Sequence, residues 1–424
     1  MVIATKPINT LTKLNGIDFL GIEESSFWNN VDTPEIRIHK IHVYPAKFPS
    51  LIAKKAFEYA ESKHLRIETV ADIFCGCGTV AVEAKRKGLD FWGCDINPVA
   101  VLISEVKSHP YDVVTVKAIF DNIVNGFNTG EIKTEYAVAN PRIQYWFIED
   151  QYNDLHKLKT AILANTENNA YRKLFLCIFS SILKSTSRWL TKSIKPQIDS
   201  KKKPQDVGNL FIKKVEIVIK SIEEAAYNDE TRISIEHNDI LRVERKDYAD
   251  MIVTSPPYVT SYEYADLHQL SALWLDYAED YTELRTDSIG SSYGMEEKEK
   301  PENLTPTATK IVEYFDWNKA QTRSIARYYS DMRKFTDKAF EILKNRGLVV
   351  FVIGDTEIGG HHIENAKCLC ECMIKSGFGL KEIHKRAVQN KLLPSHRDEN
   401  GRFSSDKSQR SIYSQEYIII GRKA

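Results

Sequence analysis

Apolar residues near the start of the chain follow two alternating periods, one typical of helices and one typical of buried strands. The elements that these periods predict are a helix over 51–62, a strand over 69–74, a helix over 80–87 and a strand over 90–94. A glycine-containing turn, 75–79, joins the first strand to the second helix, Gly88 ends that helix, and Asp95 follows the second strand. This order predicts the nucleotide-binding half of a doubly wound α/β fold, in which ligands lie beyond the carboxyl ends of parallel strands.

A long stretch of helical periodicity then interrupts the strand pattern. Its clearest helical segments are 148–164, 170–189 and 206–225. The elements predicted after it are strands at 232–236, 251–254, 347–354 and 416–421 and helices at 267–277, 325–344 and 366–376. The total fits a seven-strand-like, Rossmann-type α/β sheet with a mainly helical insertion. The expected organisation is 1–110 for the first half of the core, 111–230 for the insertion and 231–424 for the second half.

Composition adds size and charge to this picture. With 424 residues the chain exceeds a typical single domain, which agrees with one core that carries a sizeable insertion. Lys+Arg and Asp+Glu both total 58, so any nucleic-acid surface must come from local segregation of charge. The start, 1–6, lacks the apolar core of a secretory signal, and no stretch reaches the ~20 apolar residues of a membrane span. We therefore expect a soluble, cytoplasmic protein of bacterial or archaeal type.

Seven cysteines in a chain of this length do not make a disulfide scaffold. Cys368, Cys370 and Cys372 lie in a helical pattern, where a spacing of two cannot place all three on one face. A metal site would need a fourth ligand, for which His361 and His362 are the nearest candidates. Buried small apolar side chains are the simpler interpretation, and we expect no metal.

The segment 254–258, Thr-Ser-Pro-Pro-Tyr, follows the apolar run 251–253 and indicates a loop at a strand end. Its two prolines fix φ and remove two backbone donors. The Ser255 hydroxyl and the Pro256 carbonyl can therefore offer acceptor oxygens while Tyr258 holds an aromatic face nearby, an arrangement that suits a flipped nucleobase. A tight structural turn is the alternative, because Pro-Pro dipeptides commonly punctuate loops.

The turn 75–79 has the Gly76 and Gly78 spacing that lets a backbone pass close to a ligand between a strand and a helix N-terminus. Asp95 ends the next strand, where a carboxylate can accept hydrogen bonds from both ribose hydroxyls. A dinucleotide site would show the longer Gly-x-Gly-x-x-Gly, which this turn lacks.

Together, the segments 71–79 and 254–258 resemble the motifs of the site-specific DNA amino-methyltransferases, which methylate an exocyclic base nitrogen. The resemblance implies a seven-strand methyltransferase sheet, S-adenosylmethionine as cofactor and double-stranded DNA as partner. It covers mainly 36–105, 232–278 and 338–420. The order of motifs agrees with family members in which DNA recognition is inserted between the cofactor and catalytic motifs, so the insertion is a candidate recognition domain.

The resemblance also assigns carboxylates to the cofactor. Asp72 is implied near the methionine amino group, Asp95 matches the ribose ligand, and Asp239 matches the carboxylate that meets the adenine amino group. A turn or cap role fits Asp239 equally well.

The segment 39–49 resembles the family segment that packs over the methionine end of the cofactor. Tyr44, Pro45 and Phe48 would form a rigid apolar lid, and Lys47 would neutralise the methionine carboxylate. Ordinary aromatic packing at a helix start is the alternative. The residues predicted to bind the cofactor are Tyr44, Pro45, Lys47, Phe48, Asp72, Phe74, Gly76, Gly78, Thr79, Asp95 and Asp239.

An exocyclic amino group is a poor nucleophile because its lone pair is delocalised into the ring. Acceptors from the Ser255 side chain and the Pro256 carbonyl, aimed at the amino hydrogens, would favour a pyramidal nitrogen, and Tyr258 would stack on the extruded base. The predicted catalytic residues are Ser255, Pro256, Pro257 and Tyr258. Methylation of a cytosine ring carbon requires a cysteine beside a proline, and the chain has no Pro-Cys dipeptide.

Serine in the first motif position is associated in the resembling family mainly with N4 of cytosine, and Asp or Asn mainly with N6 of adenine. We therefore expect an N4-cytosine DNA methyltransferase, either as the protective half of a restriction-modification pair with a cognate restriction endonuclease or as an orphan enzyme. Adenine N6 is the alternative. An RNA base methyltransferase is less favoured because no RNA-binding appendage is evident, and a cofactor-binding module without catalysis disagrees with the intact motif.

Two segments carry locally concentrated positive charge. One lies in the insertion around Trp189 and ends in the lysine cluster 201–203; it could neutralise phosphates, although a solvated face is the alternative. The other, 391–410, is a polar, arginine-bearing loop that resembles family segments close to the catalytic face. The candidate DNA-binding residues are Lys184, Arg188, Lys192, Lys195, Arg397 and Arg402.

Overall fold

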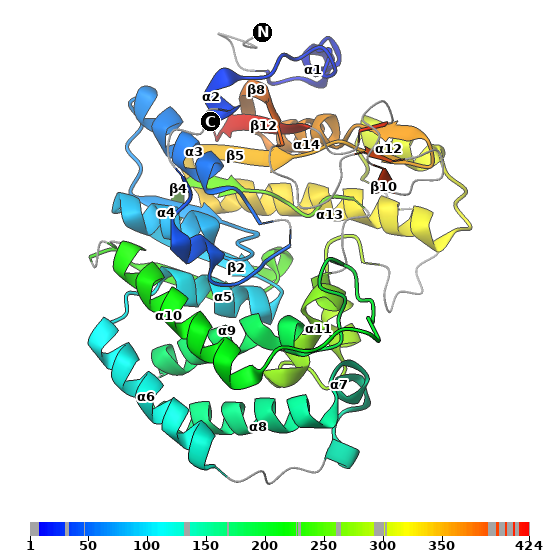
Figure 1. Cartoon of the computed structure of the whole chain (residues 1–424). Helices are drawn as coiled ribbons and strands as arrows, with labels where there is room; N and C mark the ends of the chain where they lie inside the picture. Colours follow the sequence, from blue (N-terminus) through cyan, green and yellow to red (C-terminus); the bar gives the residue numbers. More distant parts are fainter. Residues whose placement is uncertain are drawn as a thin grey trace.

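A seven-stranded sheet in the order β3-β2-β1-β4-β5-β12-β8 lies at the centre of the molecule (Figure 1). Its strands are β1 (Thr69–Asp72), β2 (Asp90–Asp95), β3 (Ile233–His237), β4 (Ala249–Thr254), β5 (Leu343–Ile353), β8 (Gly379–Ala387) and β12 (Gln415–Arg422). Neighbours from β3 to β5 pair in parallel, and β12 pairs antiparallel with both β5 and β8. The predicted seven-strand α/β sheet is confirmed.

The computed structural model describes residues 8–29, 34–45, 47–130, 136–167, 169–225, 227, 230–259, 264–291, 301, 303–388, 396–397, 403–404, 410–411 and 415–423. Of the predicted site residues, Arg402 lies outside these ranges, and Arg397 lies in a strand whose side chains are outside the description.

Helices cover both faces of the sheet. They are α3 (Ser50–Ser62), α4 (Thr79–Lys87) and α5 (Pro98–Ser108) from the first half of the chain, and α13 (Ala320–Ile342) and α14 (Asn365–Ser376) from the second. Apolar residues of α3 and α4 share a core with Val70, Val253 and Val350, whereas those of α13 and α14 share a core with Ala71 and Ile252. Adjacent strand residues face opposite sides, so the near-continuous apolar strands are buried on both faces.

The helical insertion forms a separate layer against α5 (Figure 1). It consists of α6 (Val113–Thr129), η2 (Tyr136–Val138), α7 (Pro141–Trp146), α8 (Glu149–Ala164), α9 (Asn169–Thr186) and α10 (Val207–Ala225). The helix α11 (Tyr264–Trp274) belongs to the second half of the chain but packs into this layer: the Trp274 ring centroid lies 5.6 Å from that of Phe147 and 5.7 Å from that of Phe179. The insertion and the segment after β4 therefore share one apolar core.

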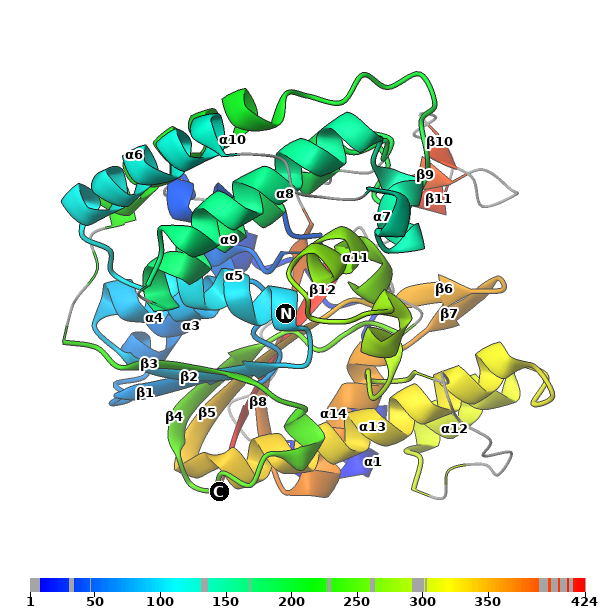
Figure 2. The same ribbon diagram turned by 90° about the horizontal axis from the view of Figure 1, so that it is seen from below.

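Smaller elements complete the chain. They are α1 (Leu11–Asn15), α2 (Ser26–Asn29), η1 (Arg37–Lys40), η3 (Ile240–Arg242), η4 (Tyr281–Arg285), α12 (Pro306–Glu313), the hairpin β6 (Thr356–Ile358) and β7 (His361–Ile363), and the small sheet of β9 (His396–Arg397), β10 (Phe403–Ser404) and β11 (Arg410–Ser411). In both views, α7, α12 and the small sheet lie toward the side to which β5 points, on the right of Figures 1 and 2. This side is the one where parallel strands of such a fold present ligands.

Most predicted elements are confirmed with boundaries shifted by a few residues. The helix predicted over 170–189 ends at Thr186, and the helix predicted over 267–277 begins and ends three residues earlier. The strand β8 had no strand prediction because its buried residues Leu380 and Ile383 are three positions apart. A register shift between Ile420 and Gly421 on the partner strand marks an irregularity that lets both residues face the same core.

The described ranges contain neither a membrane-spanning helix nor a cluster of metal ligands. No helix among these residues combines the length and the apolar character needed to cross a membrane. The same residues contain no group of three or more His, Cys, Asp or Glu side chains that could hold a metal ion. Cys368, Cys370 and Cys372 are all buried in the core under α14.

Candidate functional site

Asp72 and Thr254 end the adjacent parallel strands β1 and β4, so their side chains meet at one edge of the sheet. Thr254 Oγ1 donates a hydrogen bond to Asp72 Oδ1 at 2.6 Å, and the backbone N–H of Phe74 donates to the same oxygen at 3.1 Å. Burial raises the pKa of Asp72 to about 7. Both bonds use Oδ1, and among the residues that the structure describes none donates a hydrogen bond to Oδ2 of this buried carboxylate.

The turn after β1 requires glycine at two positions. Gly76 and Gly78 have φ values of +47° and +74°, which favour residues without a Cβ. A Cβ on Gly78 would lie 2.3 Å from Ser104 Oγ, so the turn packs directly against α5. This close packing brings the start of α4 to the carboxyl ends of β1 and β2.

Asp95 holds the same turn from the end of β2. Its Oδ2 accepts from the N–H of Gly76 at 2.8 Å and its Oδ1 from the N–H of Asn97 at 2.9 Å. Burial raises the pKa of this carboxyl group. Each carboxylate oxygen accepts one backbone hydrogen bond and keeps capacity for a further donor, such as a ligand hydroxyl.

Tyr44 lies beside the glycine turn and contacts α11. A Cβ on Gly76 would lie 3.7 Å from Tyr44 Cε1. The Tyr44 ring stacks on His268, with centroids 5.0 Å apart, and on Tyr264, with centroids 6.1 Å apart. The structure thus joins the segment before α3 to the helix after the Ser-Pro-Pro-Tyr loop, close to the turn.

His268 was not among the predicted site residues, because a single histidine in a helical pattern does not belong to a recognisable motif. The available signal was its spacing of four from Tyr264, which puts both rings on one helical face. His268 is buried, and burial lowers its pKa to about 4, so the ring that stacks on Tyr44 is neutral at physiological pH.

The other residues of the predicted lid have different partners. Lys47 Nζ lies 2.6 Å from Glu35 Oε2, so its charge is already matched within the chain. Phe48 packs against the core between the sheet and α3, and half-buried Pro45 precedes it. The structure therefore brings Tyr44 to the turn, while Phe48 belongs to a different apolar cluster.

Three further predicted cofactor residues surround the turn. The Phe74 ring meets Phe335 of α13 edge to face at 5.1 Å, and Thr79 is buried at the start of α4. Asp239 follows β3 and caps η3, because its Oδ1 accepts from the N–H of Leu241 at 2.9 Å. The cap is the observed role of Asp239, and its contact with a cofactor stays a prediction.

Ser255 begins the loop after β4 and is tied to the next strand. Its Oγ lies 2.9 Å from the carbonyl oxygen of Val352 on β5. A carbonyl only accepts, so the serine donates its hydrogen and its oxygen lone pairs are directed elsewhere. The Ser255 oxygen can therefore accept a hydrogen bond from a further donor while its own hydrogen is bonded to Val352.

The remainder of the loop is held from α13 and β12. Tyr328 OH donates to the carbonyl of Pro257 at 2.9 Å. Tyr258 OH donates to Glu416 Oε1 at 3.1 Å, and a Cβ on Gly354 would lie 3.1 Å from Tyr258 Cε2. Pro256 is buried between these contacts. The aromatic residue of the loop thus has a fixed position at the ends of β5 and β12.

The basic stretch of the insertion divides into two groups. Lys184 Nζ donates to the carbonyl of Ser193 at 2.7 Å, and Arg188 donates to the carbonyls of Gln144 and Tyr145. These two cations hold the loop after α9, a role the sequence prediction had not included. Lys192 and Lys195 are exposed on that loop.

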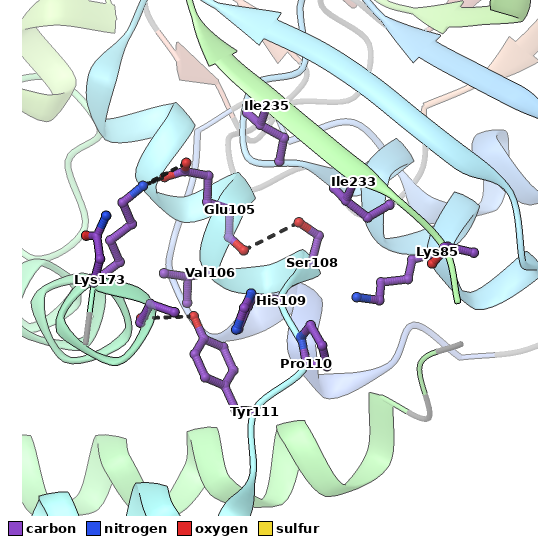
Figure 3. A pocket seen from close by; sticks show the side chains of 13 residues that line it. Lys85, Glu105, Val106, Ser108, His109, Pro110, Tyr111, Lys173, Ile233 and Ile235 are labelled. Atoms are coloured by element: carbon purple, nitrogen blue, oxygen red, sulfur yellow. Dashed lines mark hydrogen bonds and ion pairs between the residues drawn. The ribbon is translucent and has the colours of Figure 1, made fainter. Parts of the chain in front are cut away.

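A cavity of about 490 Å³ lies at the opposite end of the strands (Figure 3). It is lined by Ile233 at the start of β3, by the end of α5 and by Lys173 of α9, which pairs with Glu105 at 2.7 Å. Asp95 lies at the carboxyl end of β2, whereas Ile233 pairs near its amino end. The cavity is therefore separate from the candidate site.

Two family models match the chain. One, described as DNA methylase, matches residues 249–424, and one described as D12 class N6 adenine-specific DNA methyltransferase matches 54–294, more than half of the chain. Both spans include Ser255 to Tyr258, and the second also includes Asp72 and Asp95.

Curated proteins and solved structures give further similarities. The chain is 25% identical over 397 residues to the Type II methyltransferase M.MvaI of Kocuria varians, and this alignment covers 86% of this chain and 87% of that protein. It is 36% identical over 90 residues to the Type II methyltransferase M.MjaII of Methanocaldococcus jannaschii, and this alignment covers 21% of this chain and 16% of that protein. A solved SAM-dependent methyltransferase from Methanosarcina mazei aligns with 90% of this chain and 98% of its own at 9% identity and a TM-score of 0.30.

Proposed function

The chain belongs to the DNA amino-methyltransferases, and from this premise we propose that it methylates N4 of cytosine within a specific site of duplex DNA. The observation that carries the proposal is the serine at the first position of the Ser-Pro-Pro-Tyr loop, because Ser255 Oγ donates to the carbonyl of Val352 and keeps oxygen lone pairs for an amino hydrogen. An amino group about to be methylated needs acceptors for its hydrogens. In this family, serine at this position occurs mainly in enzymes that methylate N4 of cytosine.

S-adenosylmethionine is the cofactor of this family, and the residues at the ends of β1 and β2 fit it. Asp72 keeps one carboxylate oxygen outside its internal bonds, Asp95 keeps acceptor capacity, and Gly76 leaves space beside the Tyr44 ring. When bound, this cofactor supplies an electrophilic methyl group. Asp72 would bind its ammonium group, Asp95 its ribose hydroxyls, and Tyr44 would cover it.

Catalysis in this proposal rests on geometry instead of a covalent intermediate. Ser255 Oγ and the Pro256 carbonyl accept hydrogen bonds from the two amino hydrogens of the target base, which returns electron density to the nitrogen. The nitrogen would then bond to the methyl carbon as the carbon–sulfur bond of the cofactor breaks, and it would release one proton to solvent. Since Thr254 is bonded to Asp72, the residue before Ser255 has a fixed position relative to the cofactor carboxylate. The amino nitrogen and the methyl donor are thereby held in one geometry.

A base inside a duplex is out of reach, so the target must be extruded and stacked. Tyr258 serves as the platform in this proposal, because its hydroxyl bond to Glu416 and its contact at Gly354 keep the ring in one orientation. A platform of fixed orientation needs no ordering when the base arrives.

Adenine N6 is the second candidate. The observation that favours it is the match of residues 54–294 to a family model described as N6 adenine-specific. The same acceptors fit either amino group, so the difference would lie in the shape of the base pocket.

A restriction-modification role is part of the proposal. M.MvaI and M.MjaII are both named Type II methyltransferases, and the first spans most of this chain. The chain would then protect host DNA from a cognate restriction endonuclease that cuts the same site. In this proposal, exposed Lys192 and Lys195 on the insertion contact phosphates, which matches the basic character of DNA-binding surfaces.

One assay tests the chemistry. The protein is incubated with labelled S-adenosylmethionine and duplex DNA, and the DNA is digested to nucleosides. We expect labelled N4-methylcytosine, whereas N6-methyladenine would select the second candidate. A parallel incubation with RNA completes the assay, and label in RNA alone would refute both.

A further inference from the structure

Arg142 of α7 lies in a cluster of aromatic rings at the end of the helical insertion. Its guanidinium carbon is 4.9 Å from the ring centroid of Tyr145, 5.3 Å from that of Trp146 and 5.3 Å from that of Tyr281. Its Nε donates to Gln269 Oε1 at 2.7 Å. One hydrogen bond and three rings therefore fix the plane of this guanidinium group.

Gln269 connects this arginine to the catalytic half of the chain. It is fully buried on α11, and its Oε1 also accepts from Trp146 Nε1 at 2.8 Å. Its Nε2 donates to the carbonyl of Asp266 at 2.7 Å. Because α11 is the first helix after the Ser-Pro-Pro-Tyr loop, the position of Arg142 is set by the segment that follows the candidate catalytic residues.

The two terminal nitrogens of Arg142 have no acceptor within the part of the chain that the structure describes. Arg142 is half-buried, and its terminal nitrogens are not fully enclosed by the protein. The other arginines of the cluster differ: Arg188 donates to two backbone carbonyls, and Arg285 pairs with Asp266 at 2.5 Å. Arg142 is attracted by the nearby carboxylate of Asp280, but among these three it alone has both terminal nitrogens without a hydrogen bond to the described residues, so this planar pair of donors is available to a ligand.

The cluster around Arg142 also lies on the side of the molecule where DNA bound at the candidate catalytic loop would lie. The helix α7 is on the right in both Figure 1 and Figure 2, the side to which β5 points and on which the small sheet of β9 to β11 lies. A duplex bound across the candidate catalytic loop would have to pass this side.

We propose that Arg142 is a specificity-determining residue that reads the major-groove edge of a guanine in the recognition site. Guanine offers N7 and O6 as two adjacent acceptors, and a planar guanidinium group matches them with two parallel hydrogen bonds. This inference rests on the proposed function, because it requires duplex DNA as the substrate.

A phosphate contact is the competing role for an arginine on such a surface. Phosphates are bound by lysine and arginine alike and carry no base sequence, and exposed Lys192 and Lys195 of the insertion are available for such contacts. A guanidinium whose plane is fixed by Gln269 and by three rings gives directional recognition instead. Holding the Arg142 side chain in one orientation favours binding to a partner whose two acceptors also have one fixed orientation, as in the guanine edge.

The test compares methylation rates on a set of duplexes in which each base pair of the methylated site is varied in turn. Arg142→Gln and Arg142→Lys are compared with the unaltered protein and with Arg285→Gln, which removes an arginine next to the same Tyr281 ring. Both Arg142 variants are expected to fold, since Gln269 Oε1 keeps its bond from Trp146. Thermal unfolding and binding of S-adenosylmethionine monitor this.

We expect both Arg142 variants to lose discrimination at one G·C pair by about 10-fold to 100-fold, as one bidentate contact is worth about 1–3 kcal/mol. Arg285→Gln should keep the original preference. Lysine retains the charge but not the fork, so uniform slowing by Gln with full activity in Arg142→Lys would reveal a phosphate contact and overturn the proposal. Unchanged preference in both variants would overturn it while leaving the proposed function intact; an unaltered protein that methylates no DNA would refute both.

Discussion

Thr254 Oγ1 donates to Asp72 Oδ1 at 2.6 Å, and this bond joins the last residue of the strand before the Ser-Pro-Pro-Tyr loop to the last residue of the strand before the glycine turn. The two residues are 182 positions apart in the chain. This buried bond therefore links the proposed cofactor site directly to the proposed base site. Its consequences can be measured.

Cofactor affinity should depend on pH through Asp72. Burial raises the pKa of this carboxyl group to about 7, so in the free protein it is protonated below that pH and ionised above it. Only the ionised form attracts an ammonium group. We expect binding of S-adenosylmethionine, followed by calorimetry, to weaken as the pH falls through about 7, and Asp72→Asn to remove that dependence. An identical profile in the variant would contradict the assignment.

Thr254→Val tests the contact itself. Valine keeps the shape of threonine but lacks the hydroxyl that stabilises the ionised carboxylate and lowers its pKa. The midpoint of the affinity profile should therefore move to higher pH, while affinity well above the midpoint changes little. A midpoint at the original pH would show that the hydroxyl does not act on Asp72.

The Ser-Pro-Pro-Tyr loop should affect turnover more than cofactor binding. Ser255→Ala removes one proposed acceptor, and Tyr258→Ala removes the stacking platform; we expect each to reduce kcat by roughly 100-fold, the size of effect seen when one preorganised hydrogen-bonding group is lost. Tyr258→Phe is the matched control, because it keeps the ring and removes only the hydroxyl that contacts Glu416 and Ser255. Full turnover in both alanine variants would remove the loop from the mechanism.

Asp95 is expected to act on binding instead. Asp95→Ala removes the acceptor of the Gly76 and Asn97 N–H groups as well as the proposed ribose ligand, so affinity for S-adenosylmethionine should fall about 10-fold or more. Asp95→Asn keeps one carbonyl acceptor and should fall less. Saturating cofactor should restore methylation in Asp95→Asn, whereas a kcat that stays low would indicate a role in the chemical step.

Gly78 offers a test of stability with an internal control. Gly78 and Gly360 have φ values of +74° and +82°, so alanine costs about 1 kcal/mol of strain at either position. A Cβ on Gly78 would also meet Ser104 Oγ at 2.3 Å, whereas a Cβ on Gly360 would meet nothing within 4 Å. Urea unfolding should show Gly78→Ala to be less stable than Gly360→Ala by roughly a further 1–3 kcal/mol. Equal losses would mean that α5 moves away at little cost.

Local elements could be predicted because their signals lie within a few residues. The turn with Gly76 and Gly78, the helix that Gly88 closes, and the strand that ends at Asp95 all follow from apolar spacing and from the backbone freedom of glycine. The Ser-Pro-Pro-Tyr loop was identified in the same way, as a run of neighbouring residues after an apolar strand.

The irregular and polar elements gave no such signal. The strand β8 was not predicted because the register irregularity opposite Ile420 changes the alternation of its buried residues. The capping bond of Asp239, the pairing of Lys47 with Glu35 and the carbonyl contacts of Arg188 depend on where neighbouring segments lie, and similar sequences allow other roles.

The sequence by itself determined the α/β class, the helical insertion and the two motifs, because hydrophobic periodicity and turn chemistry act over short distances. Only the tertiary structure decided that Thr254 bonds to Asp72, that Ser255 donates to Val352, and that Arg142 is fixed by Gln269 across 127 residues. These contacts come from strand order and from the packing of α11 into the insertion. Burial and partner geometry, which no local pattern contains, set the charge, direction and availability of each group.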